Sequence, residues 1–201
     1  MTRLSNIAGV ILAAGQSSRM GRVKQTLPFR AKTILQWVVD NAIASSLERI
    51  IVVIGHRADL VEPAITGRDV TVVINDDYRK GQSSSIKAGL RALPEGTGAV
   101  LFMLGDQPLV APDTINQILN AYESSKSPIV LPIFNGKRGN PVLFSRETFP
   151  GLLSLTEDCG GRSLLKEYAG KVLELQVDDP YIHFDLDTDE DYRTLLKLET
   201  E

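Results

Sequence analysis

The stretch Val10–Lys24, "VILAAGQSSRMGRVK", runs from apolar residues into small and polar ones and then reaches three cations within six residues. Three interpretations fit this pattern: a strand that feeds a phosphate-binding loop, a secretory signal peptide, or a strand followed by an ordinary turn. The apolar core, residues 7–14, is interrupted by Gly9 and is short for a signal peptide, and a polar, basic segment follows it. The loop matches neither G-x-x-x-x-G-K-[ST] nor G-x-G-x-x-G, which excludes a Walker A loop and a dinucleotide fingerprint. A phosphate-binding loop and a solvated surface loop remain open.

The composition is typical of a globular protein, and we expect one domain over residues 1–201. Hydrophobic residues make up 43%, charged residues 23%, and the formal net charge is −3. This balance argues against a protein that coats nucleic acid, so we expect no nucleic-acid partner. Cys159 is the single cysteine, which excludes an internal disulfide and a cysteine zinc cluster. No run approaches the ~18 apolar residues of a membrane span, so we expect no membrane contact and a soluble, cytoplasmic protein.

Short apolar runs alternate with segments of helical periodicity, which is typical of an α/β protein. Between the runs, apolar residues recur at three- and four-residue spacing, as at Ile34 and Val38. The first runs are continuously β-branched, as expected for strands that helices cover on both faces. We therefore predict an open, mainly parallel sheet of the doubly wound type with helices on both faces, and a ligand site beyond the carboxyl ends of its strands. The expected strands are residues 8–13, 49–54, 70–75, 99–104 and 129–132.

Acidic and hydroxyl side chains follow several of these runs. Asp106, in "GDQP", comes after the fourth run and is either a turn residue ahead of Pro108 or an oxygen ligand for Mg²⁺; beside a basic loop, we favour the metal ligand. Gly81–Ser85, "GQSSS", opens a helix and either caps it or contacts a nucleotide. Asp185 and Asp187 point the same way on an extended segment, so both can face a metal or a ribose, or Asp187 begins the cap of the last helix.

The last helix has a clear start signal. Thr188, with Asp191 three residues later, resembles a capping box, which predicts a helix from Asp189 to about Leu198. A second start signal is the pair Pro112-Asp113, which is typical of a first helical turn.

The motifs "LAAGQSSRMGRVKQ", "GQSSS", "GDQP", "GNPVLF", "CGGRSLL" and "FDLDTDEDY" occur in the order seen in the MobA-like nucleotidyltransferases. The resemblance spans Ile7 to Tyr192 and is greatest to the molybdenum cofactor cytidylyltransferase branch. It implies a single Rossmann-like domain, Mg²⁺ as cofactor, and CTP and Mo-molybdopterin as substrates. The implied products are molybdopterin cytosine dinucleotide and pyrophosphate. It also implies transient contact with a molybdenum hydroxylase or its accessory protein.

The resemblance assigns roles to individual residues. It implies that Arg19 and Lys24 stabilise the triphosphate and the departing pyrophosphate, and that Asp106 binds Mg²⁺. Asp185 or Asp187 stands where a second metal or nucleotide contact is expected. The nucleotide-binding positions implied are Leu12, Ala13, Ala14, Gly15, Gly81 and Ser85. The acceptor-binding positions implied are Asn140, Pro141, Gly160, Gly161 and Arg162.

Several departures and alternatives accompany this resemblance. The guanylyl branch usually reads Leu-Ala-Gly-Gly where this chain has "LAAG", which favours CTP, but Ser17–Gly21 also resembles the guanylyl pattern, so GTP stays an alternative. Asn140 stands where the cytidylyl branch often has histidine, so a different phosphorylated acceptor stays an alternative as well. Beyond this reaction class, we weigh a nucleotide-binding accessory protein for a molybdenum enzyme. A serine hydrolase is disfavoured because "GQSSS" lacks the final glycine of a nucleophile elbow.

Overall fold

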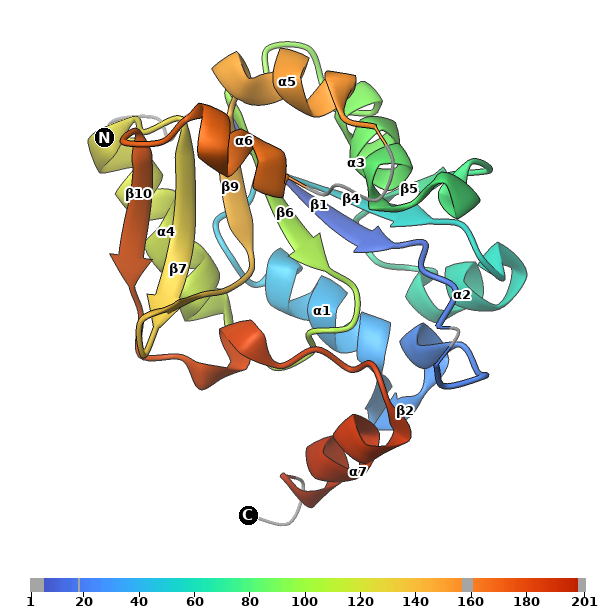
Figure 1. Ribbon diagram of the computed structural model, residues 1–201. Helices are drawn as coiled ribbons and strands as arrows, with labels where there is room; N and C mark the ends of the chain where they lie inside the picture. Colours follow the sequence, from blue (N-terminus) through green and yellow to red (C-terminus); the bar gives the residue numbers. More distant parts are fainter. Residues whose placement is uncertain (1–5, 18, 157–160, 199–201) are drawn as a thin grey trace.

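The computed structural model describes residues 6–17, 19–156 and 161–198. Its main sheet has the strand order β10-β7-β9-β6-β1-β4-β5, with β8 beside β7 (Figure 1). The path strands are β1 (Ile7–Ala13), β4 (Arg49–Ile54), β5 (Thr71–Ile74), β6 (Ala99–Leu104), β7 (Ile129–Phe134), β9 (Val142–Ser145) and β10 (Val172–Gln176). All path strands are parallel except β9, which pairs antiparallel with both β6 and β7. The expected α/β fold with a mainly parallel sheet is confirmed.

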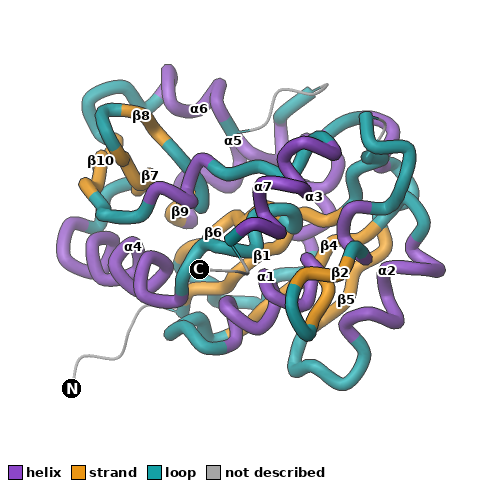
Figure 2. The backbone as a smooth tube through the Cα atoms, turned by 90° about the horizontal axis from the view of Figure 1, so that it is seen from below, coloured by secondary structure: helices purple, strands orange, loops and turns teal. Residues whose placement is uncertain are grey.

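Helices cover both faces of this sheet. Figure 2 shows the strands as a middle layer with α1 and α4 on one side and α5 and α6 on the other. The helices of the described residues are α1 (Ile34–Ile43), α2 (Ala58–Ile65), α3 (Gln82–Arg91), α4 (Pro112–Ser125), α5 (Phe149–Ser154), α6 (Arg162–Glu167) and α7 (Asp189–Lys197). Pro112 stands in the first turn of α4, as expected. No helix among these is long and apolar enough to cross a membrane.

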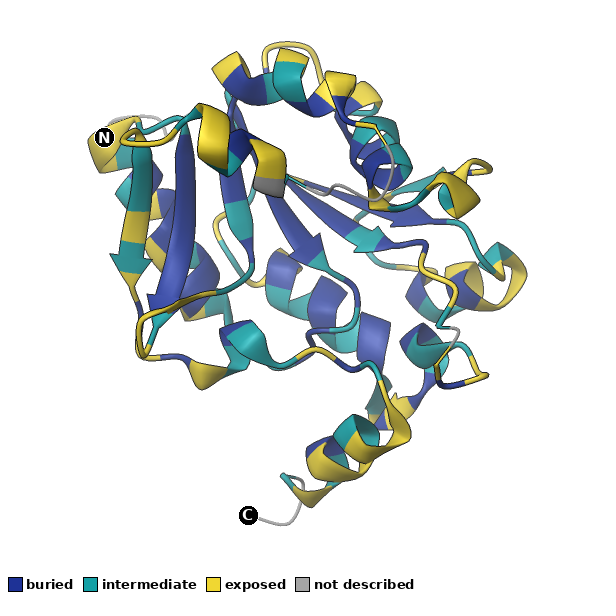
Figure 3. Cartoon of the chain, in the orientation of Figure 1, coloured by how far each residue is buried: buried dark blue, intermediate teal, exposed yellow. Residues whose placement is uncertain are grey.

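Strand β1 lies in the middle of the sheet and is buried on both sides (Figure 3). Ile11 packs into a core formed with α1, α2 and α4, whereas Val10 packs into the opposite core with α3, α5 and α6. Because successive strand residues face opposite sides, a strand buried on both faces is apolar throughout. This explains why the run at the N-terminus is continuously apolar.

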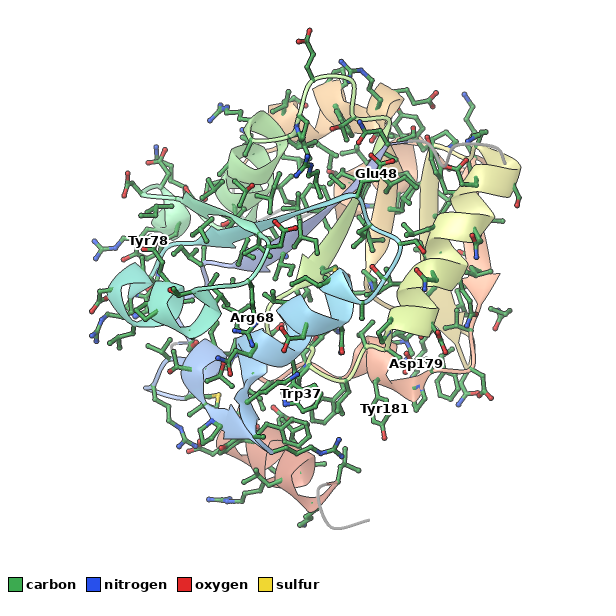
Figure 4. The ribbon with its side chains drawn as sticks, turned by 180° about the vertical axis from the view of Figure 1, so that it is seen from behind. Trp37, Glu48, Arg68, Tyr78, Asp179 and Tyr181 are labelled. Atoms are coloured by element: carbon green, nitrogen blue, oxygen red, sulfur yellow. The ribbon has the colours of Figure 1, made fainter. Side chains whose placement is uncertain are left out.

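A third apolar cluster fixes the C-terminal helix. It combines Phe29 of β2 (Pro28–Phe29) with Leu186 and with Leu195 of α7. Strand β2 pairs antiparallel with β3 (Lys32–Thr33). Trp37 of α1 lies against this cluster, between α1 and α7 (Figure 4), and donates a hydrogen bond from Nε1 to the Phe29 carbonyl at 2.9 Å. The expected capping box, Thr188 with Asp191, is confirmed at the start of α7. This packing brings the segment before α7 to the carboxyl ends of the strands.

Gly89 allows α3 to approach β1 closely. A Cβ atom added there would lie 2.5 Å from Cγ1 of Val10, which is shorter than any ordinary van der Waals contact. Because Val10 is fully buried and β-branched, it has little freedom to move away. The close approach matters for the site, since the start of α3 lies at the carboxyl ends of the strands.

We predict that Gly89→Ala lowers the free energy of unfolding by about 1–3 kcal/mol, because the overlap outweighs the gain of about 1 kcal/mol in helix propensity. Urea unfolding measures the change. Arg91→Ala, at an exposed position of the same helix, is the control and stays within about 0.5 kcal/mol of the wild type. Val10→Ala makes room for the new methyl group, so the double variant is less destabilised than the sum of the single variants. Strict additivity would contradict this packing argument.

Candidate active site

A cavity of about 640 Å³ opens at the carboxyl ends of β1 and β6. This is the edge at which ligands bind in open α/β sheets. The loop after β1, the turn before α3, the end of β6 and the segment before α7 all contribute to its wall. The lining residues are Leu12, Ala14, Gly15, Gln16, Lys24, Gln25, Tyr78, Arg79, Gly81, Gln82, Ser85, Leu104, Gly105, Asp106, Asp185 and Asp187.

Most of the residues expected from the sequence to act in catalysis, nucleotide binding or metal binding line this cavity. Two residues of these three groups do not: the Ala13 side chain is buried in the core, and Arg19 stands beside the cavity, where it forms an ion pair with a lining residue. Ala13 has its side chain on the opposite face from Leu12 and Ala14, because side chains alternate along a strand. The Ala13 carbonyl oxygen instead accepts a hydrogen bond from Nε2 of Gln25 at 3.2 Å.

Opposite charges from three distant segments meet at the cavity. Nζ of Lys24 forms ion pairs with Asp106 and, at 3.0 Å, with Oδ1 of Asp187. Nη1 of Arg19 reaches Oδ2 of Asp187 at 2.7 Å. Burial lowers the pKa of Lys24, but the Asp106 and Asp187 carboxylates outweigh this effect, so its pKa is raised and the ammonium stays charged. The loop after β1, the end of β6 and the segment before α7 are thereby joined.

Asp185 is the most perturbed carboxyl group of this cluster. Burial first, and then the negative charges of Asp106 and Asp187, raise its pKa to about 6. Nε2 of Gln107 donates a hydrogen bond to Oδ1 of Asp185 at 2.8 Å and opposes this rise. Within the described residues, no three His, Cys, Asp or Glu side chains are grouped so that they hold a metal ion as they stand. The carboxylates of Asp106 and Asp187 are instead bridged by the Lys24 ammonium.

The serine-rich turn is held by Asn75, a residue that the sequence analysis missed. The Asn75 side chain is buried and donates hydrogen bonds to Oγ of Ser84 at 2.9 Å and Oγ of Ser85 at 3.0 Å. The expected alternative, a serine cap on this helix, is wrong: Gly81 is the N-cap, and no side chain of the described residues forms a capping hydrogen bond to α3. Gly81 has φ +88°, a conformation that favours glycine.

Several other lining residues also escaped the sequence analysis. Tyr78 belongs to the 3₁₀ turn before α3 (Figure 4), its ring packs 5.8 Å from that of His56, and the Arg79 guanidinium lies 5.7 Å from its ring centroid. A Cβ atom on Gly55 would lie 2.8 Å from Cβ of Tyr78, so the glycine in "IGHR" makes room for this turn. The sequence signal for this contact was a glycine directly after a buried strand, Gly55. Its partner Tyr78 is distant in the sequence, so no local pattern connects the two residues.

The residues expected to bind the acceptor do not line the cavity in the described part of the chain. The backbone N–H of Asn140, which precedes the cis bond to Pro141, donates to the Ile182 carbonyl at 3.1 Å. A Cβ atom on Gly161 would lie 2.6 Å from Cζ of Phe144, so this glycine has a packing role. Gly160 and the side chain of Arg162 lie outside the described residues, as does Cys159. Acceptor binding by these positions stays a prediction.

Comparison with known proteins links this geometry to a family. Among curated proteins, the molybdenum cofactor cytidylyltransferase of Escherichia coli (strain K12) is 31% identical over 199 residues, covering 98% of this chain and 100% of that protein. Nicotine blue oxidoreductase of Paenarthrobacter nicotinovorans is 29% identical over 207 residues, covering 97% and 98%. The crystal structure of Rv0371c from Mycobacterium tuberculosis H37Rv in complex with manganese is 33% identical, with a TM-score of 0.84 and coverage of 97% and 100%.

The family match itself spans most of the chain. The model of the MobA-like NTP transferase domain matches residues 9–172, which includes the loop after β1, the start of α3 and the end of β6. These are three of the segments that form the cavity. This chain therefore belongs to the family of MobA-like NTP transferase domains.

Proposed function

We propose that this chain transfers CMP from CTP to the phosphate of Mo-molybdopterin and releases pyrophosphate, with Mg²⁺ as cofactor. The observation that carries the proposal is the cluster of Lys24, Asp106 and Asp187 at the strand-end cavity. Basic and acidic groups side by side suit a metal-bound polyphosphate, because the cations contact phosphate oxygens while the carboxylates hold the metal. The name of the E. coli relative supports this choice of substrates.

The cluster suits a divalent metal ion. Its carboxylate oxygens are hard ligands of the type that Mg²⁺ prefers, and the Lys24 ammonium already occupies a place between two of them as a stand-in cation. The manganese complex of the mycobacterial relative supports a divalent ion as cofactor. Asp106 and either Asp185 or Asp187 are the proposed ligands. A bound Mg²⁺ would neutralise charge on the phosphates during transfer.

The protein's own groups bind and orient the two substrates. Lys24 and Arg19 would contact the β- and γ-phosphates, so that negative charge on the departing pyrophosphate is balanced. Gly15 has open space where a Cβ atom would be, so its backbone lets a nucleotide approach closely. An oxygen of the acceptor phosphate attacks the α-phosphorus of CTP in line, the new P–O bond forms, and the bond to the pyrophosphate oxygen breaks. No protein nucleophile is needed, because positioning and charge supply most of the catalysis.

The test is a pyrophosphate-release assay with each of the four NTPs and Mg²⁺, with and without Mo-molybdopterin. Release with CTP alone among the nucleotides, dependent on the acceptor, supports the proposal. Release with GTP instead moves the chain to the guanylyl reaction, and release only with another phosphorylated compound replaces the acceptor. No release with any nucleotide overturns nucleotidyl transfer and favours an accessory nucleotide-binding protein or a redox role like that in the name of the Paenarthrobacter relative. Cytoplasmic location and contact with a molybdenum hydroxylase stay predictions.

We predict that Asp106→Asn lowers kcat/KM by on the order of 10²-fold or more, because it removes a charged metal ligand at the reacting phosphates. Pyrophosphate release with CTP and the acceptor measures this change. Asp113→Asn, the same chemical change at an exposed position of α4, is the matched control and leaves kcat/KM unaltered. Equal turnover of Asp106→Asn and the wild type would remove Asp106 from the metal site.

The raised pKa of Asp185 predicts a pH dependence. Below a pH of about 6 this carboxyl group is protonated in the free enzyme and is a poor metal ligand, so kcat/KM falls as the pH drops through about 6. Because Mg²⁺ competes with the proton, a higher Mg²⁺ concentration moves this acidic limb to lower pH. Rate profiles at two Mg²⁺ concentrations check both points. In Asp185→Asn the limb is absent; a limb that persists there belongs to another group.

A further inference from the structure

The Lys24 ammonium stands where a divalent cation would be expected. Its side chain is only 12% exposed, and the Asp106 carboxylate that it contacts is 15% exposed. A second contact joins it to Asp187. An ammonium group with two carboxylate partners competes strongly with any other cation for those carboxylates. The partial burial of Lys24 and Asp106 lowers the local dielectric constant and strengthens their attraction.

The charges of the cluster are close to balance as they stand. Asp106, Asp185 and Asp187 face the cations of Lys24 and Arg19. A divalent ion entering beside the ammonium would meet a like charge within a few ångströms, and the repulsion would offset much of what the carboxylates contribute. A triphosphate changes this balance, because its oxygens give both cations new partners outside the carboxylate cluster.

The backbone of Lys24 is held by hydrogen bonds, whereas its ammonium group is held only by its carboxylate partners. Its carbonyl oxygen accepts a hydrogen bond from the Leu27 N–H at 3.2 Å, within the 3₁₀ turn η1 (Lys24–Thr26). Its own N–H donates to Oγ of Ser17 at 3.4 Å. A lysine side chain is a flexible four-carbon stem, so the ammonium can exchange the carboxylates for phosphate oxygens while the Lys24 backbone stays in place.

We propose that Lys24 is the resident cation of this acidic cluster and keeps a divalent metal ion out until the phosphates of a nucleoside triphosphate bind the ammonium in place of the carboxylates. Metal binding is then conditional on the nucleotide, and each raises the affinity of the protein for the other. This inference rests on the proposed function for the identity of the nucleotide. It goes further in assigning Lys24 a second role, which operates before any substrate is bound.

The test measures Mn²⁺ binding to the full chain without nucleotide, by electron paramagnetic resonance of the free ion. We expect weak binding to the wild type, equally weak binding to Lys24→Arg, and at least about tenfold tighter binding to Lys24→Met, because the competing charge is gone. Lys24→Gln is a second neutral variant in case the first does not fold. Unchanged or weaker Mn²⁺ binding in the neutral variants overturns the proposal.

Two further variants locate the effect. Arg22→Met removes a cation from the same loop whose partner is Asp189, outside the cluster, and we expect it to leave Mn²⁺ binding unchanged. If Arg22→Met raised the Mn²⁺ affinity as much as Lys24→Met does, the effect would come from net charge alone, and the proposal would be overturned. Asp106→Asn combined with Lys24→Met abolishes the gain. The Mn²⁺ titration involves no turnover, so it tests this inference even if CTP is not a substrate. If the enzyme transfers CMP but Lys24→Met binds Mn²⁺ no more tightly than the wild type, only the present inference is contradicted.

Discussion

The ion pair between Lys24 and Asp106 is the contact on which the cavity depends. It joins the loop after β1 to the end of β6, and the second bond, to Asp187, adds a segment 163 residues away in the sequence. Removing one partner would leave the others as uncompensated charges in a partly buried place, which is costly. Before any ligand binds, the pair therefore holds these segments of the cavity wall together and determines the electrostatic character of the cavity.

Close backbone packing at the strand ends makes this contact possible. A Cβ atom on Gly105 would lie 2.8 Å from Cβ of Ala13, so only glycine lets the end of β6 lie so near the end of β1. The neighbouring Asp106 and the loop after β1 are thereby brought together. The small residues at these positions serve the geometry of the protein itself as well as the approach of a ligand.

The fold was predictable from the sequence because its strands are buried on both faces, and continuous β-branched runs report this burial directly. The antiparallel direction of β9 was not predictable, since it depends on pairing with β6 and β7. The nearby reversal between β7 and β8 (Lys137–Arg138) does have a local signal, the typical hairpin pair Asn135-Gly136. Asp106 and the basic loop were recognisable because they follow apolar runs, and Asp185 and Asp187 because two acids stand two residues apart on an extended segment. Asn75 and Tyr78 were not, because their roles arise from contacts with distant parts of the chain that no local pattern records.

The cluster that packs α7 against β2 has a consequence for the order in which the protein is completed. Leu186 is fully buried there, and its N–H donates to the Asp106 carbonyl at 3.3 Å, so Asp185 and Asp187 on either side of it are held at the cavity. On the ribosome these residues emerge after every strand of the sheet has been made. A nascent chain whose sheet is complete thus has the basic loop and Asp106 but lacks Asp185 and Asp187. The proposed site for metal and nucleotide is therefore completed only when α7 docks.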